Sequence, residues 1–362
     1  MALRSIPTVF LLVTVTLSSV AQTKQKDFKA VMKKHPDFSG VVLVAKEGRP
    51  VFYRAYGKRS FVSGERLRRS DIFELASVSK TFTSCVIMML AQEGRLGYDD
   101  PVERYLRMPY PGITIRHLLT HTSGLPDYQE IMDRHWDKSR VAGNPDILEY
   151  LNRYAPPRLF APGERYEYSN TGYVLLGSIA EKASGKDFVE FVRKRIFQTA
   201  GMEHADIRTP AEKKAIRNLA KGHILVKESG RYIPADSFPS SNYTIWLGNR
   251  KGPGRVSATA KDLLKWDRSL ASMLLLNDRT KEEAFRPATL NDGRKSDYGF
   301  GWFLSKTEKG EDILWHDGDN PGYKTIIRRY PASDRTLIIL NNNYYAGFEA
   351  MKDDLEKILL VR

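Results

Sequence analysis

Residues 77–80 read Ser-Val-Ser-Lys, which places a serine and a lysine three positions apart. In a helix that begins near Ser77, these two residues share one face, so the Lys80 amine can reach the Ser77 hydroxyl. The first helical turn also has unpaired N–H groups and the positive end of the helix dipole. Such a site suits a serine nucleophile that loses its proton to the lysine. A serine capping a surface helix gives the same pattern, and about one Ser-x-x-Lys is expected by chance in a chain this long.

The helix expected after Ser77 would be buried. It runs through Val86-Ile87-Met88-Met89-Leu90 and ends near Gly94, and it is apolar nearly all round beyond its first turn. A serine at the start of a buried helix is a better candidate nucleophile than one on a surface helix. Cys85, the single cysteine, lies within this helix. We expect it to be a buried, inert thiol, and one cysteine excludes an internal disulfide.

Two tyrosine–asparagine triplets could supply a partner for Ser77. Tyr168-Ser169-Asn170 stands between a Pro-Gly turn and a helix expected over 174–184. There Asn170 can cap the helix or reach a cleft, and a Tyr168 beside a lysine ammonium could lose its proton and act as a general base. The alternative is a packed tyrosine with a capping asparagine. Tyr150-Leu151-Asn152 lies in an apolar helical stretch, where the two side chains diverge, and we interpret it as structural.

Histidines occur in two further patterns. His316-Asp317-Gly318 precedes a predicted strand, and its simplest interpretation is a turn at the strand edge. His117 and His121 have the four-residue spacing of helical metal ligands, but no glutamate follows His117 and no third ligand stands at a familiar distance. We expect packing or hydrogen bonding for this pair, no metal site and no cofactor. Neither a Gly-x-Ser-x-Gly elbow nor a nucleotide-binding loop is present.

Strand patterns lie at both ends of the chain and helices lie between them. The expected strands are residues 40–45, 51–56, 298–303, 325–330 and 336–340; the expected helices include 27–35, 188–197, 257–276 and 347–360. We therefore predict an α+β fold, in which residues 22–75 and 295–362 form an antiparallel sheet subdomain. Residues 76–294 would form a mainly helical subdomain, with the active site between the two. Residues 205–250 show no clear period, which is typical of a binding loop, and the cleft candidates include Tyr128, Tyr243 and Trp246.

The N-terminus predicts an exported protein. Arg4 precedes an uncharged, mostly apolar stretch over 6–20, and Ser19-Val20-Ala21 fits a signal-peptide cleavage site, so residues 1–21 would be removed. Gln22 follows the cut, which disfavours a lipid anchor, and we expect a soluble periplasmic or extracellular protein. The formal charge of +14 falls to +13 when Arg4 is lost. The basic residues are scattered, so we expect solvated surfaces, with attraction to anionic envelope polymers as the alternative and no nucleic-acid partner.

Taken together, the three ordered motifs resemble those of the serine β-lactamase and penicillin-binding-protein superfamily, in the branch with class C β-lactamases, D-alanyl-D-alanine carboxypeptidases and esterases. The flanking sequences, residues 118–126, 162–164 and 321–323, are similar too. The resemblance implies a β-lactamase/transpeptidase-like fold. It also implies that Ser77 is the acylated nucleophile and Lys80 its deprotonating partner. Tyr168 would shuttle the proton, Asn170 would bind Lys80 and substrate, and His316 would lie close to Tyr168. The backbone N–H groups of Ser77 and Asp319 would form the oxyanion hole.

One departure from the family pattern bears on the substrate. Relatives often carry a threonine after the lysine or histidine of the third motif, where it helps to bind a substrate carboxylate. Here Asp317 takes that place, followed by Gly318 and Asp319. Two carboxylates that face the site would repel an anionic tail. We therefore expect a small-molecule or peptide substrate with an ester or amide bond and no required carboxylate. The alternatives are a β-lactamase, a D-Ala-D-Ala carboxypeptidase, or a non-catalytic penicillin-binding or sensor module.

Overall fold

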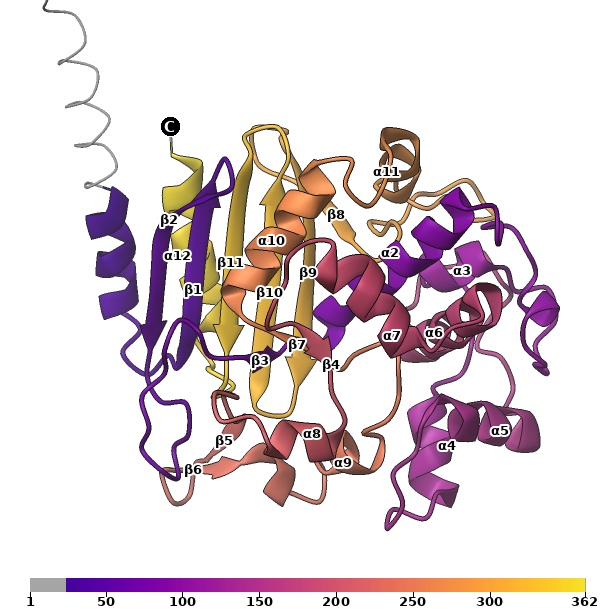
Figure 1. Ribbon diagram of the computed structural model, residues 1–362, viewed down its shortest axis with the longest axis horizontal. Helices are drawn as coiled ribbons and strands as arrows, with labels where there is room; N and C mark the ends of the chain where they lie inside the picture. Colours follow the sequence, from indigo (N-terminus) through magenta and orange to yellow (C-terminus); the bar gives the residue numbers. More distant parts are fainter. Residues whose placement is uncertain (1–23, 362) are drawn as a thin grey trace, which may run out of the picture.

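The computed structural model describes residues 24–361, so the predicted leader, residues 1–21, lies outside the described residues. One six-stranded antiparallel sheet joins the two ends of the chain (Figure 1). Its order is β2-β1-β11-β10-β9-β8, and β1 pairs with β11 along its whole length, with Val42 opposite Ile339. The predicted α+β fold with a sheet from both chain ends is therefore confirmed. The strands are β1 (Gly40–Lys46), β2 (Arg49–Tyr56), β8 (Phe303–Lys306), β9 (Asp312–Asn320), β10 (Tyr323–Tyr330) and β11 (Arg335–Asn341).

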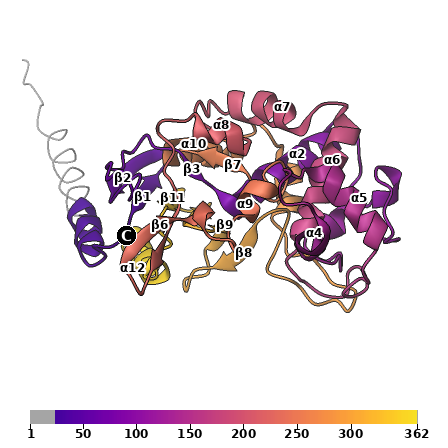
Figure 2. The ribbon, with the colours of Figure 1, turned by 90° about the horizontal axis from the view of Figure 1, so that it is seen from below.

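Helices cover both faces of the sheet, which explains why its central strands are apolar without interruption. Side chains alternate between faces, so Val42 and Ile339 share a core with the N-terminal helix over 24–33 and with α12 (Phe348–Leu360). Their neighbours Leu43 and Ile338 share the opposite core with α10 (Ala260–Ala271) and α2 (Ser79–Gln92). Seen from below, α10 and α12 lie on opposite sides of the sheet (Figure 2).

The helices of residues 79–198 gather at one end of the sheet (Figure 1). Residues 79–90 of α2 are all buried, as its apolar sequence predicted, and α2 ends shortly before Gly94. The longest of its neighbours is α6, which begins at Asn170, the last residue of the tyrosine motif. The elements of this region are η1 (Ala76–Val78), η2 (Val102–Arg104), α3 (Ile115–Leu119), α4 (Tyr128–His135), α5 (Asn144–Tyr154), α6 (Asn170–Ser184), α7 (Phe188–Val192) and the π-helix η3 (Arg193–Gln198).

Residues 205–250, which showed no period, contain several short elements. They comprise β4 (Asp206–Ile207), α8 (Pro210–Lys214), the hairpin β5 (His223–Val226) and β6 (Arg231–Pro234), η4 (Ala235–Ser237) and α9 (Tyr243–Trp246). A three-stranded sheet joins β4 to β3 (Phe73–Glu74) through β7 (Val256–Ala258), and α11 (Asp278–Ala284) follows α10. Short elements like these are held by tertiary pairing, so the sequence period does not reveal them.

Three local predictions were wrong. Residues 256–258 form strand β7 rather than the start of a helix, because they pair with β3 and β4. Residues 298–302 contribute only an isolated bridge, and the strand begins at Phe303. His316-Asp317-Gly318 lies inside β9 rather than before a strand. The division into two subdomains remains a prediction. None of the helices within residues 24–361 is long and apolar enough to cross a membrane.

Candidate active site

Ser77 lies in η1, a single 3₁₀ turn that leads directly into α2. The preceding residue, Ala76, has a φ of +47°, a conformation that costs energy for a residue with a side chain. Neighbouring strands hold this turn in place. The N–H of Leu75 donates to Val256 O in β7 at 2.9 Å, and the hydroxyl of Thr325 in β10 donates to Leu75 O at 2.9 Å. The serine thus sits on a strained turn fixed by two sheets.

Lys80 is completely buried on the first turn of α2, and its amine faces Ser77. The Nζ atom donates to Ser77 Oγ at 3.1 Å, Asn170 Oδ1 at 2.8 Å and Pro253 O at 3.0 Å. No carboxylate in residues 24–361 forms an ion pair with it. Burial, and then the charge of Arg250, lowers the pKa of Lys80 well below 10.5, and the charge of Asp317 opposes this in part. An amine with such a lowered pKa can accept a proton from Ser77.

Tyr168 lies over the same amine. The Lys80 Nζ atom is 4.6 Å from the centre of the Tyr168 ring. Although 36% of Tyr168 is exposed, desolvation of its hydroxyl raises its pKa well above 10, and a hydrogen bond with Ser77 opposes this in part. The neighbouring lysine therefore does not remove the proton of Tyr168 in the resting site. The sequence had suggested that it could. The proton acceptor in the resting site is better supplied by Lys80, and Tyr168 holds its proton.

His121 forms the support behind Tyr168. Its ring is fully buried and lies 4.3 Å from the Tyr168 ring, between centroids. Nδ1 accepts the N–H of Ser169 at 3.0 Å, whereas Nε2 is buried without a hydrogen-bond partner within residues 24–361. Because α3 ends at Leu119 and His121 has a φ of +58°, His117 and His121 do not share a helix. The packing and hydrogen-bonding interpretation fits this geometry, and the helical metal-ligand spacing is absent.

His316 is buried beside the site, but both of its ring nitrogens are engaged. Nδ1 lies 2.6 Å from Asp317 O and Nε2 lies 3.0 Å from the hydroxyl of Tyr298. A carbonyl oxygen only accepts, so Nδ1 carries the proton and Tyr298 donates to Nε2. Burial, and then the charge of Lys80, lowers the pKa of His316 to about 3, which keeps the imidazole neutral. Its ring centre is 6.3 Å from that of Tyr168. The expected proximity is present, but the two rings are tilted by 56° and no nitrogen of His316 is free to bind Tyr168.

Strand β9 approaches η1 closely at Gly318. A Cβ on Gly318 would overlap Leu75 O and would lie 2.5 Å from Thr325 Oγ1, so only glycine fits this position. The neighbouring strand β8 pairs with β9 only as far as Trp315, which leaves residues 316–320 without a partner strand on that side, within the part of the chain described. This free edge with η1 beside it is where a substrate carbonyl can bind.

The two aspartates of β9 lie toward solvent at this edge. The Asp317 side chain is 45% exposed, and Asp319 accepts a hydrogen bond from the Tyr344 hydroxyl at 3.1 Å. Burial raises the pKa of both carboxyls. Asp317 is near enough to Lys80 for its charge to raise the lysine pKa. The negative charge anticipated from the sequence is therefore beside the site.

The three aromatic cleft candidates differ in their burial and in their contacts. Trp246 is 3% exposed and belongs to a core cluster with Ile131 and Met132, so its assignment to the cleft was wrong. The indole of Trp246 packs in the core with these residues of α4 and therefore does not line the cleft. Tyr128 is 1% exposed and belongs to the same core cluster, so its assignment to the cleft was also wrong. Its hydroxyl accepts a hydrogen bond from Arg250 Nη1 at 2.8 Å. Tyr243 is partly buried, with its ring centre 5.7 Å from Arg250 Cζ.

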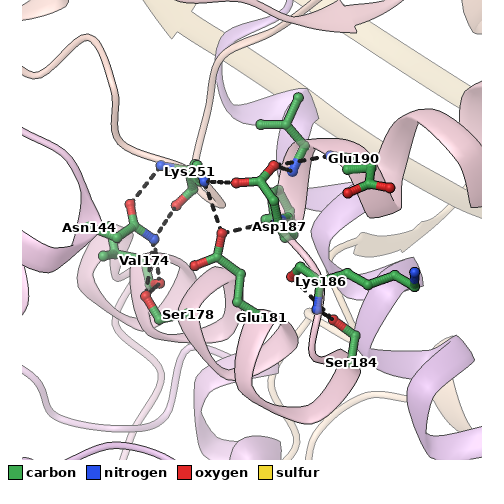
Figure 3. Close-up of polar contacts among 11 residues, drawn as sticks. Asn144, Val174, Ser178, Glu181, Ser184, Lys186, Asp187, Glu190 and Lys251 are labelled. Atoms are coloured by element: carbon green, nitrogen blue, oxygen red, sulfur yellow. Dashed lines mark hydrogen bonds and ion pairs between the residues drawn. The ribbon is translucent and has the colours of Figure 1, made fainter.

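A short loop, residues 250–254, carries Arg250 and the Pro253 carbonyl to the site, and a polar network locks it (Figure 3). Lys251 Nζ binds Glu181 at 2.9 Å and Asp187 at 2.5 Å. The Lys251 N–H donates to Asn144 Oδ1 at 2.7 Å, and Asn144 Nδ2 donates to Lys251 O at 3.2 Å. On the other side, Gly252 O accepts the Thr83 hydroxyl of α2 at 2.7 Å. Helices α2, α5 and α6 thus fix the position of this loop.

Sequence reasoning identified the motif residues but missed three neighbours: Tyr298, Arg250 and Pro253. Each comes from a segment without a recognisable motif. One signal was available, because the sequence Gly252-Pro253-Gly254 indicates a backbone that other groups approach closely. Within residues 24–361, no group of three or more His, Cys, Asp or Glu side chains could hold a metal ion. The assembled groups can perform acyl transfer: a nucleophile, an amine with a lowered pKa, a protonated tyrosine and a free strand edge.

Comparisons with known proteins agree with this chemistry. The beta-lactamase family model matches residues 26–361. The chain is 39% identical to penicillin-binding protein 4* of Bacillus subtilis over 317 residues, which are 87% of this chain and 70% of that protein. It is 27% identical to a D-aminopeptidase of Gluconobacter oxydans, over 88% of this chain and 58% of that protein. The crystal structure of a penicillin-binding protein from Bacillus halodurans superimposes with a TM-score of 0.79 at 27% identity, covering 91% of this chain and 98% of that one. The chain therefore belongs to the beta-lactamase family and is a serine hydrolase.

Proposed function

We propose that this hydrolase cleaves an ester or amide bond through an acyl-enzyme on Ser77. The observation that carries the proposal is the buried Lys80 amine, 3.1 Å from Ser77 Oγ and without a carboxylate partner in residues 24–361. In its neutral form, which the lowered pKa favours, the amine held there by Asn170 and Pro253 can take the serine proton as the hydroxyl attacks the carbonyl. The resulting ammonium forms next to the negative charge that develops on the substrate.

The other groups have complementary roles in the proposed reaction. Tyr168 keeps its proton in the resting site, so it can pass a proton to the leaving group and then accept one from the water that hydrolyses the acyl-enzyme. The backbone N–H groups of Ser77 and Asp319 would stabilise the oxyanion at the free edge of β9. One such donor is typically worth about 2.7–4 kcal/mol of barrier. His316 would act through Tyr298 by fixing the wall behind Tyr168.

Two substrate classes remain in the proposal. The aspartates of β9 favour esters and amides whose reacting end carries no carboxylate against that strand. The relatives named as penicillin-binding protein and D-aminopeptidase favour peptides of D-amino acids or β-lactams as the second class. A non-catalytic module is disfavoured because the amine, the hydroxyl and the asparagine are already within hydrogen-bond distance. Export through a leader over residues 1–21 and attraction to anionic envelope polymers stay part of the proposal, supported by the sequence and its +14 charge.

Active-site labelling tests the acyl-enzyme. A fluorophosphonate probe should add one adduct to the wild-type chain, measured by intact mass, and none to Ser77→Ala. Ser63→Ala, which changes an exposed serine, is the matched control and should label like the wild type. An adduct that persists in Ser77→Ala would overturn the proposal. Lys80→Ala and Tyr168→Phe should each lower kcat/KM by orders of magnitude, because these groups act as a unit.

A substrate panel separates the two classes. It consists of p-nitrophenyl esters, a chromogenic cephalosporin and a peptide that ends in D-Ala-D-Ala, each assayed with the wild type and with Ser77→Ala. We expect ester turnover that depends on Ser77. Inert esters together with rapid cephalosporin hydrolysis would reverse the order of the two classes.

A further inference from the structure

Arg250 is a buried cation without a carboxylate partner. It is 9% exposed, yet no aspartate or glutamate within residues 24–361 forms an ion pair with it. Its Nη1 donates to the Tyr128 hydroxyl, and its Nε is buried with no hydrogen-bond partner in the described part of the chain. Buried charges in folded proteins are normally paired, since an isolated charge loses its hydration without compensation. Arg250 therefore has unused capacity to bind an anion.

The guanidinium group lies near the turn that carries the catalytic serine. A Cβ placed on Gly254 would lie 3.9 Å from Arg250 Nη2 and 3.9 Å from Ala76 O, the carbonyl that precedes Ser77. Because Gly254 has no side chain, the space beside both of these groups is not filled by a Cβ of that residue. The charge of Arg250 also acts on the Lys80 amine. The cation therefore lies close to the catalytic groups.

The position of Arg250 is fixed before any substrate binds. The Arg250 N–H donates to Leu247 O at 3.2 Å, and the next residue, Lys251, is held by the network in Figure 3. A planar guanidinium held in this way is suited to bidentate contact with a carboxylate, at little entropic cost. Strand β9 carries Asp317 and Asp319, which repel an anion. The site is therefore positive at Arg250 and negative along β9.

We propose that Arg250 determines specificity by binding a carboxylate of the substrate, which is thereby held away from the aspartates of β9. The inference rests on the proposed hydrolase function and adds a substrate class to it: amides and esters that carry a free carboxylate in addition to the scissile bond. The carboxylate can belong to the acyl part or to the leaving group, and two substrate pairs distinguish these.

The first measurement compares matched substrates. N-succinyl- and N-butyryl-D-alanine p-nitroanilide differ by a carboxylate on the acyl part; D-Ala-D-Ala peptides with a free or an amidated C-terminus differ by one on the leaving group. In one pair the wild type should prefer the anionic member by at least about tenfold in kcat/KM. In Arg250→Gln this preference should disappear, because the variant lacks the cation that attracts the carboxylate but keeps the aspartates that repel it. The ratio cancels any effect of the substitution on Lys80 or on the fraction folded.

The controls separate a recognition role from a structural one. Arg250→Lys should retain part of the preference, because it keeps the positive charge. Tyr128→Phe should reduce the preference, because it removes the hydroxyl that holds Nη1 of Arg250 in place. Arg49→Gln removes the same charge from an exposed position on β2 and should leave the preference unchanged. An unchanged ratio in Arg250→Gln for both pairs, or an equal loss in Arg49→Gln, would refute the inference.

A binding measurement keeps this test independent of turnover. N-succinyl-D-alanine and acetyl-D-Ala-D-Ala are titrated separately into each protein, and the melting temperature is followed. At least one of them should raise the Tm of the wild type and of Arg49→Gln, but not that of Arg250→Gln. Stabilisation without turnover and without fluorophosphonate labelling would contradict the acyl-enzyme and leave Arg250 supported. No stabilisation of the wild type by either compound would refute carboxylate binding.

Discussion

Replacing Lys80 with methionine should change how the stability of the protein depends on pH. Lys80 is completely buried without a carboxylate partner in residues 24–361, and burial lowers its pKa well below 10.5. The unfolded chain binds a proton at this lysine below about pH 10.5, whereas the folded chain does not until the pH falls to the lowered pKa. In that window, unfolding takes up one proton, so the wild type becomes more stable as the pH rises. The methionine side chain of the variant binds no proton in either state.

The expected size follows from proton linkage. One proton taken up on unfolding changes the free energy of unfolding by about 1.4 kcal/mol per pH unit. The free energy of unfolding of the wild type minus that of Lys80→Met should therefore rise with this slope between the lowered pKa of Lys80 and about pH 10.5. Other titrating groups are common to both proteins and largely cancel. The absolute difference at one pH is less informative, since methionine also leaves Asn170 and Pro253 without their hydrogen bonds.

Urea unfolding followed by fluorescence, at several pH values in this range, measures that slope. Lys309→Met removes an exposed lysine and is the matched control, for which the difference should stay flat. A flat difference for Lys80→Met as well would mean that Lys80 is protonated in the folded protein at neutral pH. The amine could then not take the Ser77 proton, and the proposed order of proton transfers would fail.

Two further changes test the geometry and the charge of the site. In Gly318→Ala the new Cβ would overlap Leu75 O, so β9 must move back by about 1 Å from the serine turn. The kcat/KM for an ester should therefore fall about 100-fold, with a loss of about 1–3 kcal/mol in unfolding free energy. Gly172→Ala is the control, because its Cβ would be no closer than 3.5 Å to its neighbours, and it should keep its activity. A folded Gly318→Ala with wild-type kcat/KM would show that activity does not need the close approach of β9 to the serine turn. Asp317→Asn removes a carboxylate that raises the pKa of Lys80, so this pKa falls and the acid limb of the kcat/KM–pH profile should move to lower pH. A limb that stays in place or moves to higher pH would contradict the assignment of Lys80 as the base.

The sequence predicts the parts of the site that depend on local spacing. Ser77 and Lys80 are three residues apart at the start of a buried helix, and their side chains meet as that spacing requires. Asn170 begins α6 and reaches Lys80, as its position before a helix suggested. The central strands and α2 were also recognisable, because long apolar runs have few other solutions in a folded domain.

The remaining contacts depend on tertiary structure. Arg250, Pro253 and Tyr298 reach the site from segments whose composition resembles that of any loop or short strand. The neutral state of His316 depends on burial, which no spacing reveals. The same applies to Trp246, an aromatic residue in an irregular region that could as well have lined a cleft as filled a core. The three residues of β7 adopt strand geometry only because β3 and β4 lie on either side of them.

The pairing of β1 with β11 also determines when the site can form. Val42 and Ile339 are opposite one another, although about 300 residues of chain separate them. Closing so long a loop must precede the contacts that repay its entropy, so the main sheet forms late and slowly. The serine turn rests on β9 and β10, which leave the ribosome after four fifths of the chain has been made. A growing or truncated chain that contains Ser77 and Lys80 but lacks these strands therefore has no active site, and hydrolysis begins only with the complete sheet.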